Sequence, residues 1–124
     1  MTLREIFEAE LARYGLAWCR ACCDSRSHAR GFVDHAQRNV VHLASEIATR
    51  SSLHRGFHEI AHAVLDETGL RRYERELQAN RFAEARMRDL GIPVPRKVSS
   101  AGQGYVRRMK RWGDRVRDGR KASE

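Results

Sequence analysis

The sequence predicts a small α+β domain in which a short antiparallel sheet lies beside two adjacent helices. The chain has 124 residues, enough for one modest hydrophobic core but not for two. Segments with apolar residues at helical spacing alternate with short runs rich in β-branched residues. With 41% hydrophobic and 32% charged residues the composition is typical of a soluble globular protein, and no apolar run is long enough to span a bilayer.

The N-terminal segment predicts a packing helix, a strand and a loop. Thr2 is a suitable N-cap and Gly15 a suitable stop for this helix. The apolar residues at helical spacing between them are Leu3, Ile6, Phe7, Leu11 and Tyr14. Residues 16–21 then predict a first strand, and residues 22–28 predict a loop.

Three cysteines, Cys19, Cys22 and Cys23, lie close together at the end of this strand. A Cys-x-x-Cys pair is half of a zinc ribbon, but the chain has no second pair to complete one. His28 is available as a fourth ligand, although all ligands would then lie within ten residues. We expect partly buried, reduced thiols, with a small metal site as the alternative.

Residues 31–34 and 39–44, joined by the polar residues 35–38, predict a β-hairpin. Its second arm leads into a helix that Ser51 or Ser52 can cap and that Gly69 would end. The apolar residues at helical spacing in this second helix are Leu53, Phe57, Ile60, Ala61, Val64 and Leu65.

This helix carries the sequence His-Glu-Ile-Ala-His at residues 58–62. His58 and His62 lie one turn apart on one face, which suits two positions of a tetrahedral Zn²⁺ site. Glu59 points about 100° round the helix from His58, where it can reach a metal-bound water as a general base. The alternative is that both histidines are ordinary helix-surface residues.

A third helix is predicted from Arg71 or Arg72 to Leu90, and Glu76 on it can supply the third metal ligand. Ala79 and Ala83 are small enough for two helices to approach as closely as a shared metal requires. The alternative is that Glu76 forms surface ion pairs and that a competing carboxylate, Glu74, lies nearer the metal. The basic residues available for such pairs are Arg72, Arg75 and Arg81.

Residues 91–95 contain two prolines and end the helical region, so we divide the chain into a domain at 1–95 and a segment at 96–124. The segment holds ten Lys/Arg and three Asp/Glu, so +7 of the net charge of +8 lies there. Tyr105, Met109, Trp112 and Val116 form one apolar stripe at helical spacing. We expect this stripe to pack on the domain; the alternatives are binding to nucleic acid or to an acidic protein.

The motif at residues 58–62 and the sequence Glu-Leu-Gln-Ala-Asn-Arg-Phe-Ala at residues 76–83 resemble the zincin-like metallopeptidases of the ImmA/IrrE type. More loosely, they resemble the metallopeptidase domain of ArdC-type antirestriction proteins. The resemblance covers about residues 40–90. The interval from His62 to Glu76 is short for the family, and the Leu-Leu-Met-Pro-like segment that often follows the second motif is replaced.

The resemblance implies that a zinc ion is bound by His58, His62 and Glu76. It also implies that Glu59 is the catalytic base and that Asn80 supports a ligating histidine. In such enzymes the strand before the active-site helix takes up substrate on its free edge, which would place substrate along residues 39–44. We expect His42 on that strand to face solvent, although it could face the cleft and stabilise an oxyanion.

The implied reaction is zinc-dependent hydrolysis of a peptide bond in a bacterial or phage regulatory protein. The alternative is a binding protein on a zincin scaffold, such as a phage or mobile-element inhibitor of a host defence system, that acts by occlusion. The N-terminus lacks the apolar stretch of a signal peptide, so the expected location is the cytoplasm.

Overall fold

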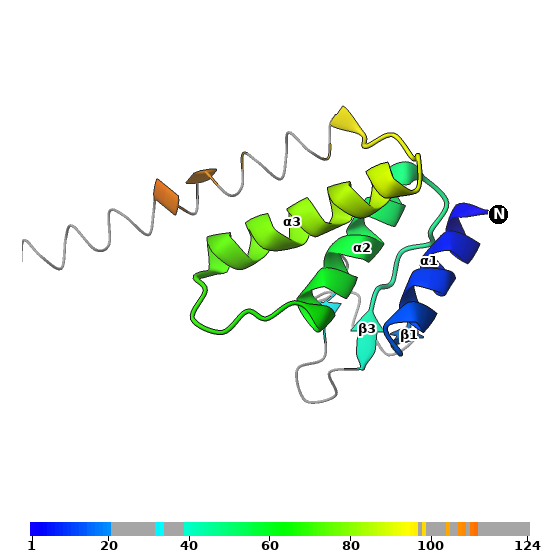
Figure 1. The fold of residues 1–124 in the computed structure, drawn as a ribbon, viewed down its shortest axis with the longest axis horizontal. Helices are drawn as coiled ribbons and strands as arrows, with labels where there is room; N and C mark the ends of the chain where they lie inside the picture. The colour runs from blue at the N-terminus through cyan, green and yellow to red at the C-terminus, as the bar shows by residue number, and fades with distance from the viewer. Residues whose placement is uncertain are drawn as a thin grey trace, which may run out of the picture.

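The computed structural model describes residues 1–20, 39–96, 98, 104, 107, 108, 110 and 111, together with the backbone of residues 32–33. Within these residues the elements in chain order are α1 (Leu3–Arg13), β1 (Ala17–Cys19), β2 (Phe32–Val33), β3 (Val40–His42), α2 (Arg50–Val64) and α3 (Arg72–Asp89) (Figure 1). The predicted small α+β architecture is therefore confirmed.

The sheet is mixed, with the strand order β1-β3-β2. β2 and β3 are antiparallel, with Phe32 opposite His42, so the predicted hairpin pairing is confirmed. β1 and β3 are parallel, with Ala17 opposite Val40, so the prediction of an antiparallel sheet is wrong for this strand. The long connection that contains β2 allows β1 and β3 to run in the same direction.

β3 is the central strand, and two expectations about this strand are wrong. Both of its edges are occupied by neighbouring strands, so it offers no free edge to a substrate peptide. His42 pairs with Cys19 on one side and with Phe32 on the other, and is only 8% exposed. His42 therefore does not face solvent.

Helix α1 begins as predicted. The hydroxyl of Thr2 accepts a hydrogen bond from the Glu5 N–H at 3.1 Å, and the Glu5 carboxylate accepts one from the Thr2 N–H at 3.0 Å. This capping box satisfies amide groups that a helix leaves unpaired at its first turn.

Helix α2 begins earlier than predicted, with Thr49 as its N-cap in place of Ser51 or Ser52. The Thr49 hydroxyl accepts a hydrogen bond from the Ser52 N–H at 3.1 Å, and Ser52 Oγ accepts one from the Thr49 N–H at 2.9 Å. Ser52 thus serves as the third residue of a capping box. The helix ends with Leu65 as its C-cap, before Gly69.

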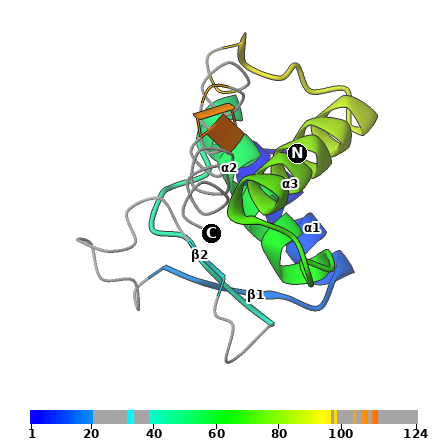
Figure 2. The same ribbon diagram turned by 90° about the vertical axis from the view of Figure 1, so that its left-hand side faces the viewer.

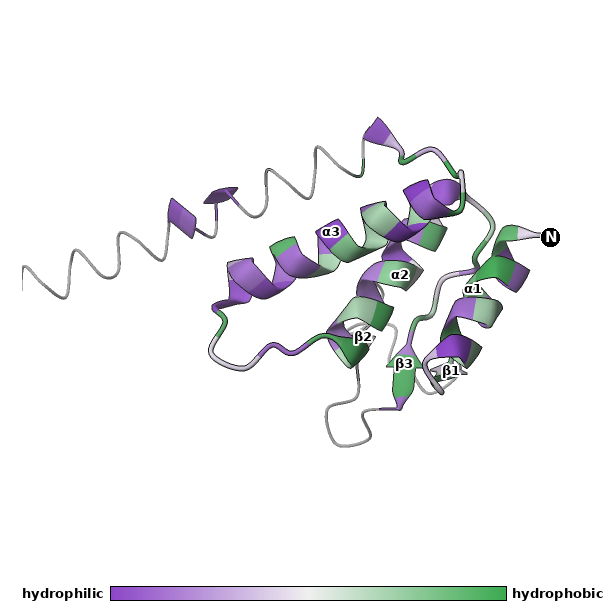
Figure 3. Cartoon of the chain, in the orientation of Figure 1, coloured by the Kyte–Doolittle hydropathy of each residue, from purple (hydrophilic) through white to green (hydrophobic). Residues whose placement is uncertain are grey.

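Side chains from all three described helices and from β3 form one hydrophobic core. The three helices lie to one side of the strands (Figure 2). The buried members of the core are Phe7, Leu11, Val41, Leu43, Ile47, Leu53, Phe57, Ile60, Ala83 and Met87. Trp18 in β1 closes one side: its ring meets Phe7 edge-on at 5.0 Å between centroids, and its Nε1–H donates to the carbonyl of Leu43 at 2.9 Å. α3 contributes few apolar residues and is mostly hydrophilic (Figure 3).

Helix α3 ends at the predicted position. Gly91 adopts a positive φ of 72°, and the N–H of Ile92 donates to the carbonyl of Met87 at 2.8 Å, as in a Schellman C-cap. Ile92 and Val94 then pack against the core. The chain after α3 therefore returns to the domain at least as far as Val94.

The apolar stripe predicted at Tyr105, Met109, Trp112 and Val116 lies outside the described residues, so its packing stays a prediction. The described cations of this segment at 107, 108, 110 and 111 are helical and exposed. None of the described helices is both long and apolar enough to cross a bilayer.

Cys19 is disulfide-bonded, so the expectation of a reduced thiol at this position is wrong. That expectation was based on the reducing conditions of the cytoplasm and not on a structural signal. Cys22, Cys23 and His28, the other members of the alternative metal site, lie outside the described residues.

Candidate metal centre

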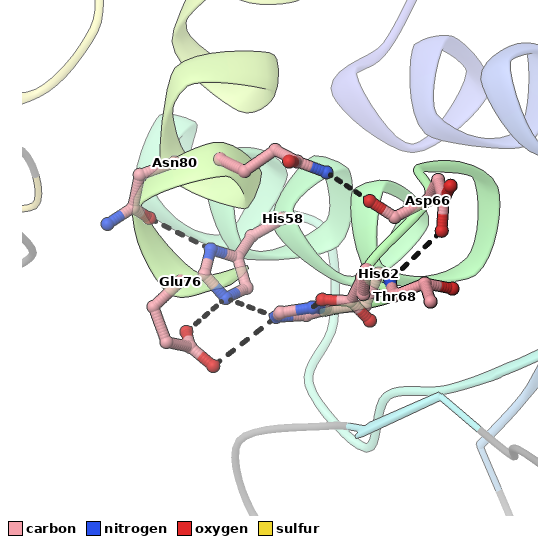
Figure 4. A network of polar contacts seen from close by, with 8 residues as sticks. His58, His62, Asp66, Thr68, Glu76 and Asn80 are labelled. Carbon is pink, nitrogen blue, oxygen red and sulfur yellow. Dashed lines mark hydrogen bonds and ion pairs between the residues drawn. The ribbon is translucent and has the colours of Figure 1, made fainter. Parts of the chain in front are cut away.

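Helices α2 and α3 bring His58, His62 and Glu76 together (Figure 4). His58 Nε2 lies 2.9 Å from Glu76 Oε2 and 3.1 Å from His62 Nε2, and His62 Nε2 lies 3.4 Å from Glu76 Oε1. Among the residues that the structure describes, this is the one group of three or more His, Cys, Asp or Glu side chains whose donor atoms are close enough to hold a metal ion.

The three separations fit a tetrahedral zinc site. With zinc–ligand bonds of about 2.0–2.1 Å and tetrahedral angles, two donor atoms lie roughly 3.3 Å apart. The separations of 2.9, 3.1 and 3.4 Å are close to this value, and the two that involve Glu76 are to different oxygens of its carboxylate. Side-chain exposures of 15%, 14% and 26% for His58, His62 and Glu76 leave the group accessible to solvent. Three protein ligands and an accessible fourth position are typical of catalytic zinc sites.

Both histidines are oriented by a second hydrogen bond. His58 Nδ1 lies 2.8 Å from Oδ1 of Asn80, and His62 Nδ1 lies 2.8 Å from Oε2 of Glu67. Each acceptor is an oxygen, so Nδ1 carries the proton and donates it. This tautomer leaves the lone pair of each Nε2 directed towards the other donors, as metal ligation requires.

The electrostatics of the group favour a positive charge at its centre. Burial would raise the pKa of Glu76, but hydrogen bonds from His58 and His62 outweigh it and hold that pKa well below its usual range. Burial would lower the pKa of His62, but the carboxylates of Glu76 and Glu67 hold it above its usual value. When no ion is bound, these hydrogen bonds to Glu76 need a proton on Nε2 of the donating histidine. A bound cation would replace that proton, and the Nε2 lone pairs and the carboxylate would then face the ion.

Glu59 lies outside the donor group and is only 7% exposed. Burial raises its pKa to about 7, against the opposing effects of the nearby His58 and His62. A carboxyl group with such a pKa can accept and release a proton near neutral pH, as a general base must.

The competing assignment for Glu76 does not hold in the structure. Glu76 meets the two histidines and not the arginines of its own helix. Glu74 instead accepts a hydrogen bond from the Arg71 N–H at 3.2 Å, at the start of α3. The carboxylate two residues before Glu76 is thus engaged in helix capping.

Two residues near this site were not singled out by sequence reasoning. Glu67 follows the last turn of α2, and only its place in a short interhelical connection could have suggested it. His54 lies one turn before His58 and is 3% exposed, and its Nε2 has no hydrogen-bond partner among the described residues. Burial, with a smaller repulsion from His58, lowers the pKa of His54 to about 4, so it is neutral at pH 7.

Compared with protein-family models, with curated proteins and with solved structures, the chain matches none.

Proposed function

We propose that this chain is a zinc-dependent peptidase with a small zincin-like domain, acting on a bacterial or phage regulatory protein in the cytoplasm. The observation that carries the proposal is the convergence of His58 Nε2, His62 Nε2 and the Glu76 carboxylate within 3.4 Å of one another. Cys19 is disulfide-bonded, and disulfide bonds are uncommon in the cytoplasm.

The proposed mechanism gives each side chain a separate task. His58 and His62 are neutral donors and Glu76 is an anionic one, so the site would retain part of the charge of a divalent ion. Zinc, when bound there, would supply a Lewis acid for the scissile carbonyl and would lower the pKa of water. Glu59 would take a proton from the attacking water and deliver it to the leaving amine, for which its pKa of about 7 is suited.

The strand arrangement changes where an extended substrate can bind. β3 is paired on both sides, so main-chain recognition along it is closed. We propose that substrate instead approaches the donor group from the solvent side of α2 and α3, where Glu76 is 26% exposed. Side-chain contacts would then contribute more to recognition than strand addition does.

The test combines metal analysis with one substitution. Elemental analysis of the purified full-length chain should find about one zinc per chain. Glu59→Gln should retain that zinc and abolish cleavage of a peptide library followed by mass spectrometry, because the base is not a ligand. Glu74→Gln, which removes a carboxylate engaged in helix capping, is the matched control and should cleave as the wild type does.

A folded wild-type chain without bound metal would exclude the proposed function. Full cleavage by Glu59→Gln would exclude the proposed mechanism. The chain would instead be assigned to the binding-protein class if the wild type cleaved no peptide and Glu59→Gln retained both zinc and the ability to inhibit a host defence system.

A further inference from the structure

We propose that Glu67 is a positioning residue of the metal site and that the connection between α2 and α3 is built to hold it against His62. This inference rests on the proposed metal site. It assigns a function to a carboxylate that lies outside the proposed donor group.

The contact itself is short and shielded. Glu67 Oε2 lies 2.8 Å from His62 Nδ1, and the two side chains are only 16% and 14% exposed. A shielded, charge-assisted hydrogen bond holds its partners more firmly than an exposed surface pair does. Because Nδ1 is the donor, the bond fixes both the rotation of the imidazole and the tautomer that leaves Nε2 available.

The backbone on both sides of Glu67 is anchored within a short connection between Val64 and Arg72. The carbonyl of Glu67 accepts a hydrogen bond from the Leu70 N–H at 3.1 Å. The carbonyl of Asp66 accepts one from the Gln78 side-chain amide at 3.3 Å, which ties the connection to α3 (Figure 4). Glu67 therefore lies in an ordered turn, which fixes the position of its backbone.

A second feature of the same turn supports this interpretation. Oδ1 of Asp66 accepts a hydrogen bond from the Thr68 N–H at 2.9 Å, and this bond spans Glu67 in the sequence. Gly69 follows with a φ of 76°, a conformation that favours glycine. The turn is thus fixed from Asp66 onwards by local hydrogen bonds and by one glycine.

The two proposed histidine ligands are supported by different chemistry. His58 meets the neutral amide oxygen of Asn80, whereas His62 meets a carboxylate. A carboxylate partner makes the imidazole a stronger electron donor as well as orienting it, while an amide mainly orients it. We therefore expect removal of Glu67 to weaken metal binding more than removal of Asn80 does.

The experiment measures zinc affinity of the full-length chain by competition with a chromophoric chelator, and the visible spectrum of the same proteins loaded with Co²⁺. The variants are Glu67→Ala, Glu67→Gln and Asn80→Ala, with Glu74→Gln as the control of matched charge. Glu67→Ala should weaken zinc affinity roughly 10- to 100-fold, which is the range typical of losing a residue that supports a metal ligand. It should also shift the cobalt spectrum. Glu67→Gln, whose amide oxygen can still accept from Nδ1–H, should recover part of that loss.

Wild-type zinc affinity and an unchanged cobalt spectrum in Glu67→Ala would overturn the inference. It would also be overturned if Glu67→Ala lowered the melting temperature but left the cobalt spectrum unchanged, since Glu67 would then stabilise the fold alone. If the wild type bound neither metal, the proposed function would fail together with the inference. If the wild type bound zinc and His58→Ala did not, the proposed metal site would stand. Unchanged zinc affinity and an unchanged cobalt spectrum in Glu67→Ala would then count against the inference alone.

Discussion

Replacing His54 by leucine should separate a buried histidine from the two proposed metal ligands on the same helix. His54, His58 and His62 lie at four-residue spacing, but only the last two converge with Glu76. His54 is 3% exposed, and its Nε2 has no hydrogen-bond partner among the described residues. Leaving such an atom buried costs about 1–3 kcal/mol, so a leucine of similar size should be tolerated or should stabilise the fold at neutral pH.

The acid sensitivity that His54 causes can be derived from its pKa, which burial lowers from 6.5 to about 4. Between these values the unfolded chain takes up a proton that the folded chain does not, so stability falls as pH falls from 6.5 to about 4. At about 1.4 kcal/mol per pKa unit, the loss reaches about 3 kcal/mol at the acid end. His54→Leu lacks this titrating group, so its free energy of unfolding should fall less than that of the wild type as the pH is lowered.

Urea unfolding of chelator-treated wild type and His54→Leu at about pH 7, 5.5 and 4.5 measures this difference directly. Comparing the two proteins removes the contributions of the other titrating carboxyl groups, which both retain. Zinc analysis of untreated protein should find the ion retained in His54→Leu and lost in His58→Leu. A pH-independent difference in stability, or loss of zinc from His54→Leu, would refute the reasoning.

Three further predictions concern the proposed ligand, the core and the basic segment. Glu76→Ala should weaken zinc at least 10- to 100-fold by chelator competition, whereas Glu74→Ala should change it little; equal losses would mean that the ligand is misassigned. Gly56→Ala should lower the urea midpoint by an amount equivalent to about 1 kcal/mol. The added Cβ would lie 3.1 Å from the ring of Phe7, and this overpacking outweighs the gain in helix propensity. A raised midpoint would contradict this prediction. Removal of residues 97–124 should lower the melting temperature if the apolar stripe packs on the domain, whereas an unchanged melting temperature with loss of salt-sensitive nucleic-acid binding would assign the segment to nucleic acid.

The helices could largely be predicted from the sequence because their signals are local. Thr2 and Gly15 bracket α1, and the turn at Gly91 ends α3, since caps and stops act within a few residues. The start of α2 was missed because several residues there can cap a helix. Thr49 takes that position because Ser52 can complete a capping box with it, three residues further on.

The direction in which β1 pairs and the burial of His42 could not be predicted, because both depend on contacts between distant segments. A strand of three residues, Ala17–Cys19, carries no signal for the direction in which it pairs. His42 was expected to face solvent, but it is 8% exposed, and which face of a strand is covered depends on packing by distant segments. Glu67 was missed for a similar reason, since a carboxylate in a connection indicates a site only when its partner is known.

The short interval between His62 and α3 places the second helix so that its side chains meet those of α2. α2 ends at Val64 and α3 begins at Arg72, so Glu76 lies one turn into α3 and opposite His62. One turn further along α3, Asn80 meets His58, and beyond it Glu84 interacts electrostatically with His54. Because both helices present these side chains at four-residue spacing, the contacts stay in register along the pair. His58 and His62 keep about 15% of their side-chain surface in solvent, whereas His54 keeps 3% of its residue surface. An ion can therefore reach His58 and His62 but not His54. The depth of each side chain in the helix pair distinguishes three residues of the same type.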